Sequence, residues 1–120
     1  MAHRLEDLFA LQAARTLKRE VYDLLRRTRA HRDLEFTSQV RAAAASIESN
    51  IAEGYRRSAR DFARFLLVAR TSLDEVEVRL RDGIDRGHYG PEEPARLTGQ
   101  LRLTTAAIMR LRRRLLDGSK

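Results

Sequence analysis

The chain has 120 residues, a formal net charge of +7 and no cysteine. This length suits a single domain over residues 1–120, and the lack of thiols excludes disulfides, thiolate chemistry and cysteine-ligated zinc. No apolar run approaches membrane-spanning length and residues 1–12 lack the apolar region of a signal peptide, so we expect a cytoplasmic protein with no membrane partner.

The first helix is predicted over residues 5–28, where apolar residues such as Leu17, Val21 and Leu24 recur at helical spacing. The link that follows contains no glycine or proline, and we expect Leu34 and Phe36 to cover the end of the bundle. The helix ends in a basic run made of Arg26, Arg27, Arg29 and Arg32. This run is either a favourable charge at a helix C-terminus, where partial negative charge accumulates, or a binding patch.

The second helix is predicted over residues 37–53, because Val40, Ile47 and Ile51 fall on one apolar stripe. Its other alanines and serines form a face of small side chains, which indicates burial on more than one side. Gly54 is expected to follow this helix in a left-handed conformation, since many helices end on such a residue.

The third helix is predicted over residues 58–86 and should be the longest of four. Ser58 is its expected N-cap, with Asp61 in the capping-box position. Apolar residues recur at spacings of three and four from Phe62 to Ile84. The acidic cluster in this helix has no Glu-x-x-His pattern, so we expect ion pairs along the helix and neither a metal nor another cofactor.

The polar residues Asn50 and Glu53 lie in an otherwise close-packed helix. They are either a polar site between helices or side chains that tie the helix end to the following turn. Short polar side chains commonly find backbone partners, which favours the structural interpretation.

The fourth helix is predicted over residues 91–116, after a break at residues 87–90 and with Pro91 at its first position. It carries the densest basic run of the chain. Apolar residues away from the main stripes exceed what one core needs, so we expect oligomerisation to bury them; they are Leu67, Val68, Val78, Leu103 and Leu116.

These four helices predict an all-α fold, an antiparallel up-down four-helix bundle. One pole of such a bundle gathers Arg4, Arg56, Arg57, Arg60, Arg110, Arg112, Arg113 and Arg114. The opposite pole gathers Arg26, Arg27, Arg29, Arg32 and Arg86. Basic ends on a net-basic protein indicate a surface for nucleic acid or another polyanion, and the alternative is that these charges are only solvated.

A family resemblance is carried by residues 37–41, TSQVR, and 46–54, SIESNIAEG, with Asp61-Phe62 and Arg64-Phe65-Leu66 after them. These residues resemble the signature of the 23S rRNA-intervening-sequence proteins, a bacterial four-helix bundle family. The resemblance covers essentially the whole chain, with three departures. Glu48 stands where the family usually has proline, Thr71 where it often has glycine, and Ala42 where a second arginine is common.

The resemblance extends to the accessory proteins of diversity-generating retroelements, which share the bundle and tend to be basic. Both groups are described as homopentamers without catalytic activity. The resemblance therefore implies a pentameric ring of this chain, and it implies that partners could include a reverse transcriptase carrying its template RNA.

Three functions fit these observations. The sequence contains no nucleophile–base pair, P-loop, dinucleotide fingerprint or metal-ligand spacing, so we expect no enzymatic activity. The first hypothesis is an oligomeric scaffold that binds RNA or DNA through arginines of both poles: Arg56, Arg57, Arg60, Arg110, Arg112, Arg113, Arg114, Arg26, Arg27 and Arg29. The second is a protein–protein adaptor whose arginine-rich faces dock an acidic protein. The third is a bundle with a purely structural role and no ligand.

Overall fold

The computed structural model describes residues 5–118, and side chains from residue 9 onward. Arg4, expected at the first pole, lies outside these residues. The described chain is all-α, with five α-helices, a short 3-10 helix (η1) and no strand. Its elements are α1 (Leu5–Arg27), η1 (Arg29–Arg32), α2 (Leu34–Tyr55), α3 (Ala59–Asp85), α4 (Glu92–Ala95) and α5 (Thr98–Leu116). Within the described residues, no helix combines the length and apolarity needed to cross a bilayer.

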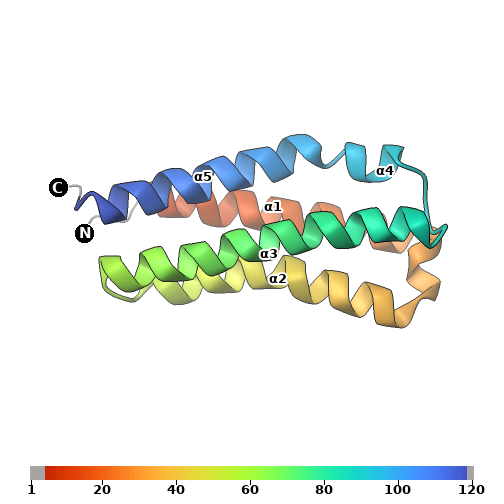
Figure 1. The fold of residues 1–120 in the computed structure, drawn as a ribbon, viewed down its shortest axis with the longest axis horizontal. Coiled ribbons are helices and arrows are strands. Elements are labelled where there is room, and N and C mark those ends of the chain that lie inside the picture. The colour runs from red at the N-terminus through yellow and green to blue at the C-terminus, as the bar shows by residue number, and fades with distance from the viewer. Residues whose placement is uncertain (1–4, 119–120) are drawn as a thin grey trace.

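The four long helices lie along the longest dimension of a molecule that measures 49 × 23 × 17 Å (Figure 1). Helix α2 packs against α1 and α3, and α5 packs against the same two helices. The α2–α3 turn lies at the same end of the molecule as the end of α5, and we call this end the first pole (Figure 1). Helix η1 and the α3–α4 link lie at the other end, the second pole.

The predicted inward faces form the core. Leu17, Val21 and Leu24 of α1 and Ile47 and Ile51 of α2 are buried. They meet the stripe of α3 that runs through Phe62, Leu66, Ala69, Leu73, Val76 and Leu80. Because a fully buried side chain of this size is worth about 1.5–3 kcal/mol relative to an exposed one, this contact set dominates the stability of the fold.

Two predicted boundaries need correction. Helix α2 begins at Leu34 rather than at residue 37, because the Asp33 side chain caps it by accepting a 3.1 Å hydrogen bond from the Phe36 backbone N–H. As a result Phe36 is buried as expected, but Leu34 points outward with 78% of its surface exposed. The fourth predicted helix is divided at residues 96–97 into α4 and α5. Pro94 has no N–H to donate, which weakens the helix just before this break.

Gly54 does not follow α2 but lies inside it, and it is not in a left-handed conformation; within residues 5–118 only Gly87 and Gly118 have positive φ. A different feature explains why residue 54 is a glycine. A Cβ atom at Gly54 would lie 2.7 Å from Phe62 Cδ1 and 2.8 Å from Phe65 Cβ. Glycine is therefore required here by the close approach of α3, not by a turn.

The turn itself comes two residues later. The Arg57 N–H donates to the Gly54 carbonyl at 2.9 Å, and the Ser58 hydroxyl accepts from the Asp61 N–H at 3.2 Å. Ser58 is thus the N-cap of α3, as predicted. At 27 residues α3 is also the longest helix of the described chain.

The small residues of α2 are only partly covered within one chain. Ser46 is half-buried and its hydroxyl lies 2.9 Å from that of Ser72, where α2 and α3 approach closely. Asn50 donates back to the Ser46 carbonyl at 2.8 Å, so the prediction that it holds the following turn is wrong. Ala42 and Ser49 are exposed.

Candidate nucleic-acid interface

The first pole brings together arginines that are far apart in the sequence. Arg56 lies in the α2–α3 turn, Arg60 in the first turn of α3, and Arg110 and Arg113 in the last turns of α5. All four are exposed, and none makes an ion pair with another residue in the part of the chain that the structure describes. We call these four residues the unpaired arginines. Their guanidinium groups are available to an anionic ligand.

Two other predicted arginines of the first pole are engaged within the chain. Arg57 donates to Glu53 at 2.7 Å, and its guanidinium lies 5.1 Å from the centre of the Phe65 ring. The hydrogen bond from Arg57 lowers the pKa of Glu53, and the pair ties the end of α2 to the turn, as predicted for Glu53. The half-buried Arg112 donates to the Ala63 carbonyl at 3.1 Å, which links α5 to α3. Arg114 is exposed on the last turn of α5.

Two of the arginines predicted to bind nucleic acid at the second pole, Arg26 and Arg27, lie beside acidic partners. Arg27 donates to Asp23 at 2.7 Å and to Glu93 at 2.9 Å, and Arg26 lies 3.8 Å from Asp23. Hydrogen bonds to Asp23 and to Glu93 raise the pKa of Arg27, and the bond to Asp23 has the larger effect. Arg29 is exposed and forms no ion pair among the described residues.

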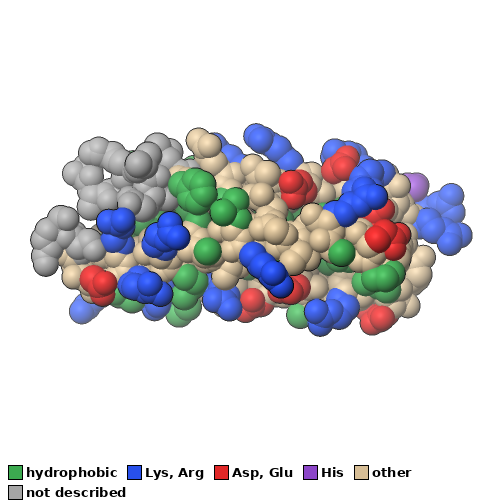
Figure 2. All heavy atoms as spheres, turned by 90° about the horizontal axis from the view of Figure 1, so that it is seen from above, with side chains coloured by type: hydrophobic (Ala, Val, Ile, Leu, Met, Phe, Trp, Pro, Cys, Tyr) green, Lys and Arg blue, Asp and Glu red, His purple; other side chains and the backbone are tan. Residues whose placement is uncertain are grey.

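The two poles consequently differ in charge. Residues 5–10, 53–64 and 106–118, which form the first pole, hold eight basic and five acidic residues. Residues 23–35 and 82–97, which form the second, hold six basic and seven acidic residues. Among the charged side chains that Figure 2 colours, blue is more frequent than red at its left end, the first pole, and the two are mixed at its right end. The first pole is therefore net positive and the second is slightly net negative, and a net positive surface favours a polyanion.

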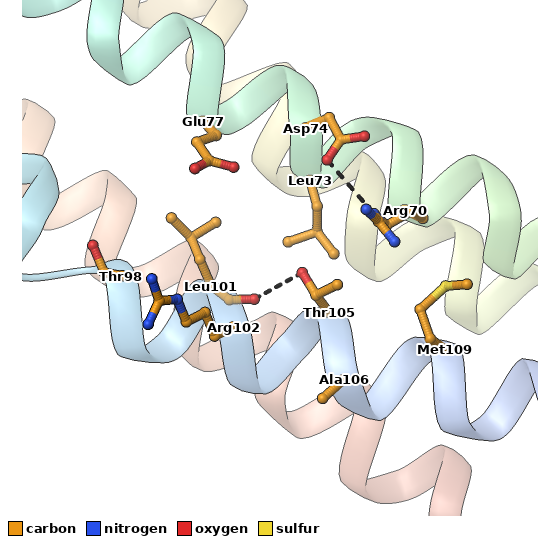
Figure 3. A pocket seen from close by; sticks show the side chains of 10 residues that line it. All are labelled: Arg70, Leu73, Asp74, Glu77, Thr98, Leu101, Arg102, Thr105, Ala106 and Met109. Carbon is orange, nitrogen blue, oxygen red and sulfur yellow. Dashed lines mark hydrogen bonds and ion pairs between the residues drawn. The ribbon is translucent and has the colours of Figure 1, made fainter.

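An open groove of about 520 Å³ runs between α3 and α5 (Figure 3). Leu73, Leu101 and Met109 line it together with side chains of both charges. Arg70 Nε lies 3.5 Å from the Asp74 carboxylate at one wall. Because its charges are mixed, the groove favours neither an anionic nor a cationic ligand. Among the described residues there is also no group of three potential metal ligands.

Comparison of the sequence with models of known protein families identifies one match. A family model described as 23S rRNA-intervening sequence protein matches residues 6–110. The chain belongs to this family. None of the curated proteins compared with the chain matches it. The family resemblance read from residues 37–66 is therefore confirmed.

Glu48 forms an ion-paired cluster with two basic residues of α1. The Glu48 carboxylate accepts from Arg15 Nε at 2.7 Å and lies 2.7 Å from Lys18 Nζ, so it joins α2 to α1. Burial alone would raise the pKa of Glu48, but the hydrogen bonds from Arg15 and Lys18 outweigh it and the pKa is lowered. Glu48 thus forms an ion-paired contact between the two helices.

Sequence reasoning missed a second cluster, centred on Asp33 at the second pole. Asp33 Oδ2 accepts from His88 Nε2 and from Arg86 Nη1, both at 2.9 Å, in addition to capping α2. The neighbouring Tyr89 donates its hydroxyl to the Leu80 carbonyl at 2.7 Å. These bonds hold the α3–α4 link against the start of α2. No spacing in the sequence could have indicated them, because Asp33 and His88 are 55 residues apart.

The Asp33 cluster predicts a pH dependence of stability. Hydrogen bonds from His88, the Phe36 N–H and Arg86 lower the pKa of Asp33 from 3.8 to about 2. A carboxyl whose pKa is lower in the folded chain stabilises it above the unfolded pKa, and this contribution is lost as the pH falls through the folded pKa. We expect the urea midpoint of the wild type to exceed that of Asp33→Asn at pH 7, and the difference to shrink between about pH 4 and pH 2.

Asparagine is itself a good N-cap, so this variant keeps the cap of α2 and isolates the charge. A difference between the two midpoints that stays constant from pH 7 to pH 2 would contradict the role given to the Asp33 carboxylate.

Proposed function

We propose that this family member is a non-enzymatic scaffold that binds RNA or DNA through its first pole. The observation that carries the proposal is the set of unpaired arginines, Arg56, Arg60, Arg110 and Arg113, at one end of the bundle. Arginine suits this role because its planar guanidinium forms two parallel hydrogen bonds with a phosphate. The family name supports a role connected with RNA. Since phosphate contacts carry no base information, the scaffold should show little sequence preference.

In this proposal the bundle has up-down topology and assembles with copies of itself. The passage of successive long helices between the two poles supports the topology (Figure 1). The exposure of Leu67, Val68, Val78, Leu103 and Leu116 supports oligomerisation, because association removes such surface from water. By resemblance to the family we propose a homopentameric ring, and by resemblance to the retroelement accessory proteins a reverse transcriptase as a possible further partner.

The proposal is tested by removing three of the unpaired arginines together. The variant Arg56→Gln/Arg60→Gln/Arg113→Gln should bind a labelled 30-nucleotide single-stranded RNA more weakly in fluorescence anisotropy at low salt. For a single strand each phosphate contact contributes about −0.7 to the slope of log K against log salt, so three lost contacts should flatten the slope by about 2.

A matched control lies at the second pole. The variant Arg26→Gln/Arg27→Gln/Arg29→Gln removes the same charge, but two of its arginines already have acidic partners. Its effect on affinity and slope should be clearly smaller. Equal losses in both variants would show that binding follows net charge rather than the first pole.

The adaptor hypothesis is decided by the same assay. If the wild type binds no RNA or DNA at low salt but binds a poly-glutamate peptide through the unpaired arginines, the first pole docks an acidic protein. If it binds neither, its arginines are solvated charges and the proposal fails.

A further inference from the structure

The exposed aromatic rings of the chain lie at the first pole. The sequence contains four phenylalanines, three tyrosines and no tryptophan. Among the residues whose side chains the structure describes, only two aromatic residues are exposed: Phe9 at 49% and Tyr55 at 46%. Phe9 lies near the start of α1 and Tyr55 is the last residue of α2, and both of these helix ends belong to the first pole (Figure 1). The pole that carries the unpaired arginines therefore also carries the accessible aromatic surface.

The remaining aromatic rings are covered within the chain. They are buried or half-buried, and they are Tyr22, Phe36, Phe62, Phe65 and Tyr89. At the second pole Phe36 is buried, and the half-buried Tyr89 donates its hydroxyl to the Leu80 carbonyl. The second pole thus offers a ligand neither a net positive charge nor an exposed ring.

Tyr55 is the better placed of the two exposed rings to act together with the arginines. It directly precedes the unpaired Arg56 in the chain. Its ring meets the Phe62 ring edge to face, with the two centroids 6.4 Å apart and the ring planes at 85°. Because Phe62 is completely buried, this contact holds the Tyr55 ring in a fixed orientation while nearly half of the residue faces water.

We propose that the first pole binds single-stranded nucleic acid, with one base stacked on the Tyr55 ring and neighbouring phosphates held by the unpaired arginines. This inference rests on the proposed function and names its ligand more closely. A single strand can stack its bases on an aromatic side chain, whereas a duplex keeps the faces of its bases inside its own stack. Every base has such a face, so stacking agrees with little sequence preference.

The two forms of nucleic acid distinguish stacking from charge. A surface that acts by charge alone favours a duplex, because a duplex carries twice as many phosphates per unit length as one of its strands. A surface that also stacks a base gains a contact that only the single strand supplies. A preference for the single strand is therefore the signature of the Tyr55 contact.

Competing the two forms of one RNA against each other tests this preference. The wild type should bind the labelled 30-nucleotide single strand about fivefold more tightly than the duplex formed with its complement. Tyr55→Leu should weaken single-strand binding about tenfold, near the lower end of what one stacked base contributes, and should leave duplex binding unchanged. Tyr55→Phe should bind like the wild type, because stacking needs the ring and not the hydroxyl.

The matched control for the loss of a ring is Tyr22→Leu. The Tyr22 ring is half-buried, and the Arg41 guanidinium lies 5.7 Å from its centre. This variant should bind both forms of RNA like the wild type. Circular dichroism confirms that each variant is folded.

A tryptophan at position 55 reports stacking directly. The chain has no tryptophan, so Tyr55→Trp introduces a single fluorophore whose emission is quenched when a base stacks on it. The single strand should quench this emission and the duplex should not. In Tyr22→Trp, neither form of RNA should change the emission.

Two results would each overturn the stacking contact: a wild type that binds the duplex at least as tightly as the single strand, and a Tyr55→Leu variant that binds the single strand like the wild type. If either is found while replacement of Arg56, Arg60 and Arg113 still weakens RNA binding, the pole holds phosphates without stacking and the proposed function stands. If the wild type binds neither form at low salt, both proposals fail.

Discussion

Gly54→Val is expected to destabilise the fold on the order of 3 kcal/mol, at the upper end of the cost of overpacking a core. Residue 54 lies inside α2, where a Cβ atom would come within 2.8 Å of Phe62 Cδ1 and Phe65 Cβ. Phe62 is completely buried and cannot rotate away without disturbing the core. The Phe65 Cβ atom is attached to the backbone of α3, so α2 and α3 must move apart to admit valine. Urea denaturation monitored by circular dichroism measures the change.

Gly99→Ala is the matched control for this prediction. Gly99 is exposed in α5, and a Cβ atom there would meet nothing within 4 Å. Since alanine is favoured over glycine in a helix by up to about 1 kcal/mol, this variant should be as stable as the wild type or more so. An unchanged midpoint for Gly54→Val would show that the close contact between α2 and α3 is not needed for the fold.

RNA binding by the wild type is expected to depend steeply on salt. If the four unpaired arginines each contact one phosphate of a single strand, log K should fall with log salt at a slope of about −2.8. Raising the salt from 50 to 200 mM should then weaken binding on the order of 50-fold. Anisotropy titrations of the 30-nucleotide RNA at four salt concentrations give the slope. More than one copy on the same strand would make it steeper.

The control for salt dependence uses the first-pole variant. With Arg56, Arg60 and Arg113 replaced by glutamine, one unpaired arginine is left, and the slope should fall to about −0.7. A wild-type slope near zero would mean that contacts other than ion pairs with phosphate hold the RNA, and the first pole would lose its proposed role.

Several structural features were predictable from the sequence because they depend on residues close together in the chain. Helical spacing of apolar residues gave the long helices and their buried stripes, since this period follows from 3.6 residues per turn. The cap of α3 was predictable because Ser58 and Asp61 lie three residues apart. The sequence also indicated the excess of exposed apolar side chains, because Leu67, Val68 and Val78 fall away from the buried stripe.

The family was predictable for the same reason. Its signature is carried by short runs, and the family model matches residues 6–110. The grouping of the first-pole arginines followed from helix order, since short links place the turn after α2 beside the end of α5 (Figure 1).

Only the tertiary structure decided the role of Gly54 and the state of each arginine. In a sequence, a glycine near a helix end is compatible with a turn or with a close contact between helices. The positions of the Phe62 and Phe65 side chains show that Gly54 serves a close contact. The sequence alone makes Arg27 a candidate binding residue. The folded chain shows that it donates a hydrogen bond to Glu93, which is 66 residues away. Ion pairs between distant elements depend on how the links pack, which no local spacing encodes, so the contrast between the two poles emerges only when the chain is folded.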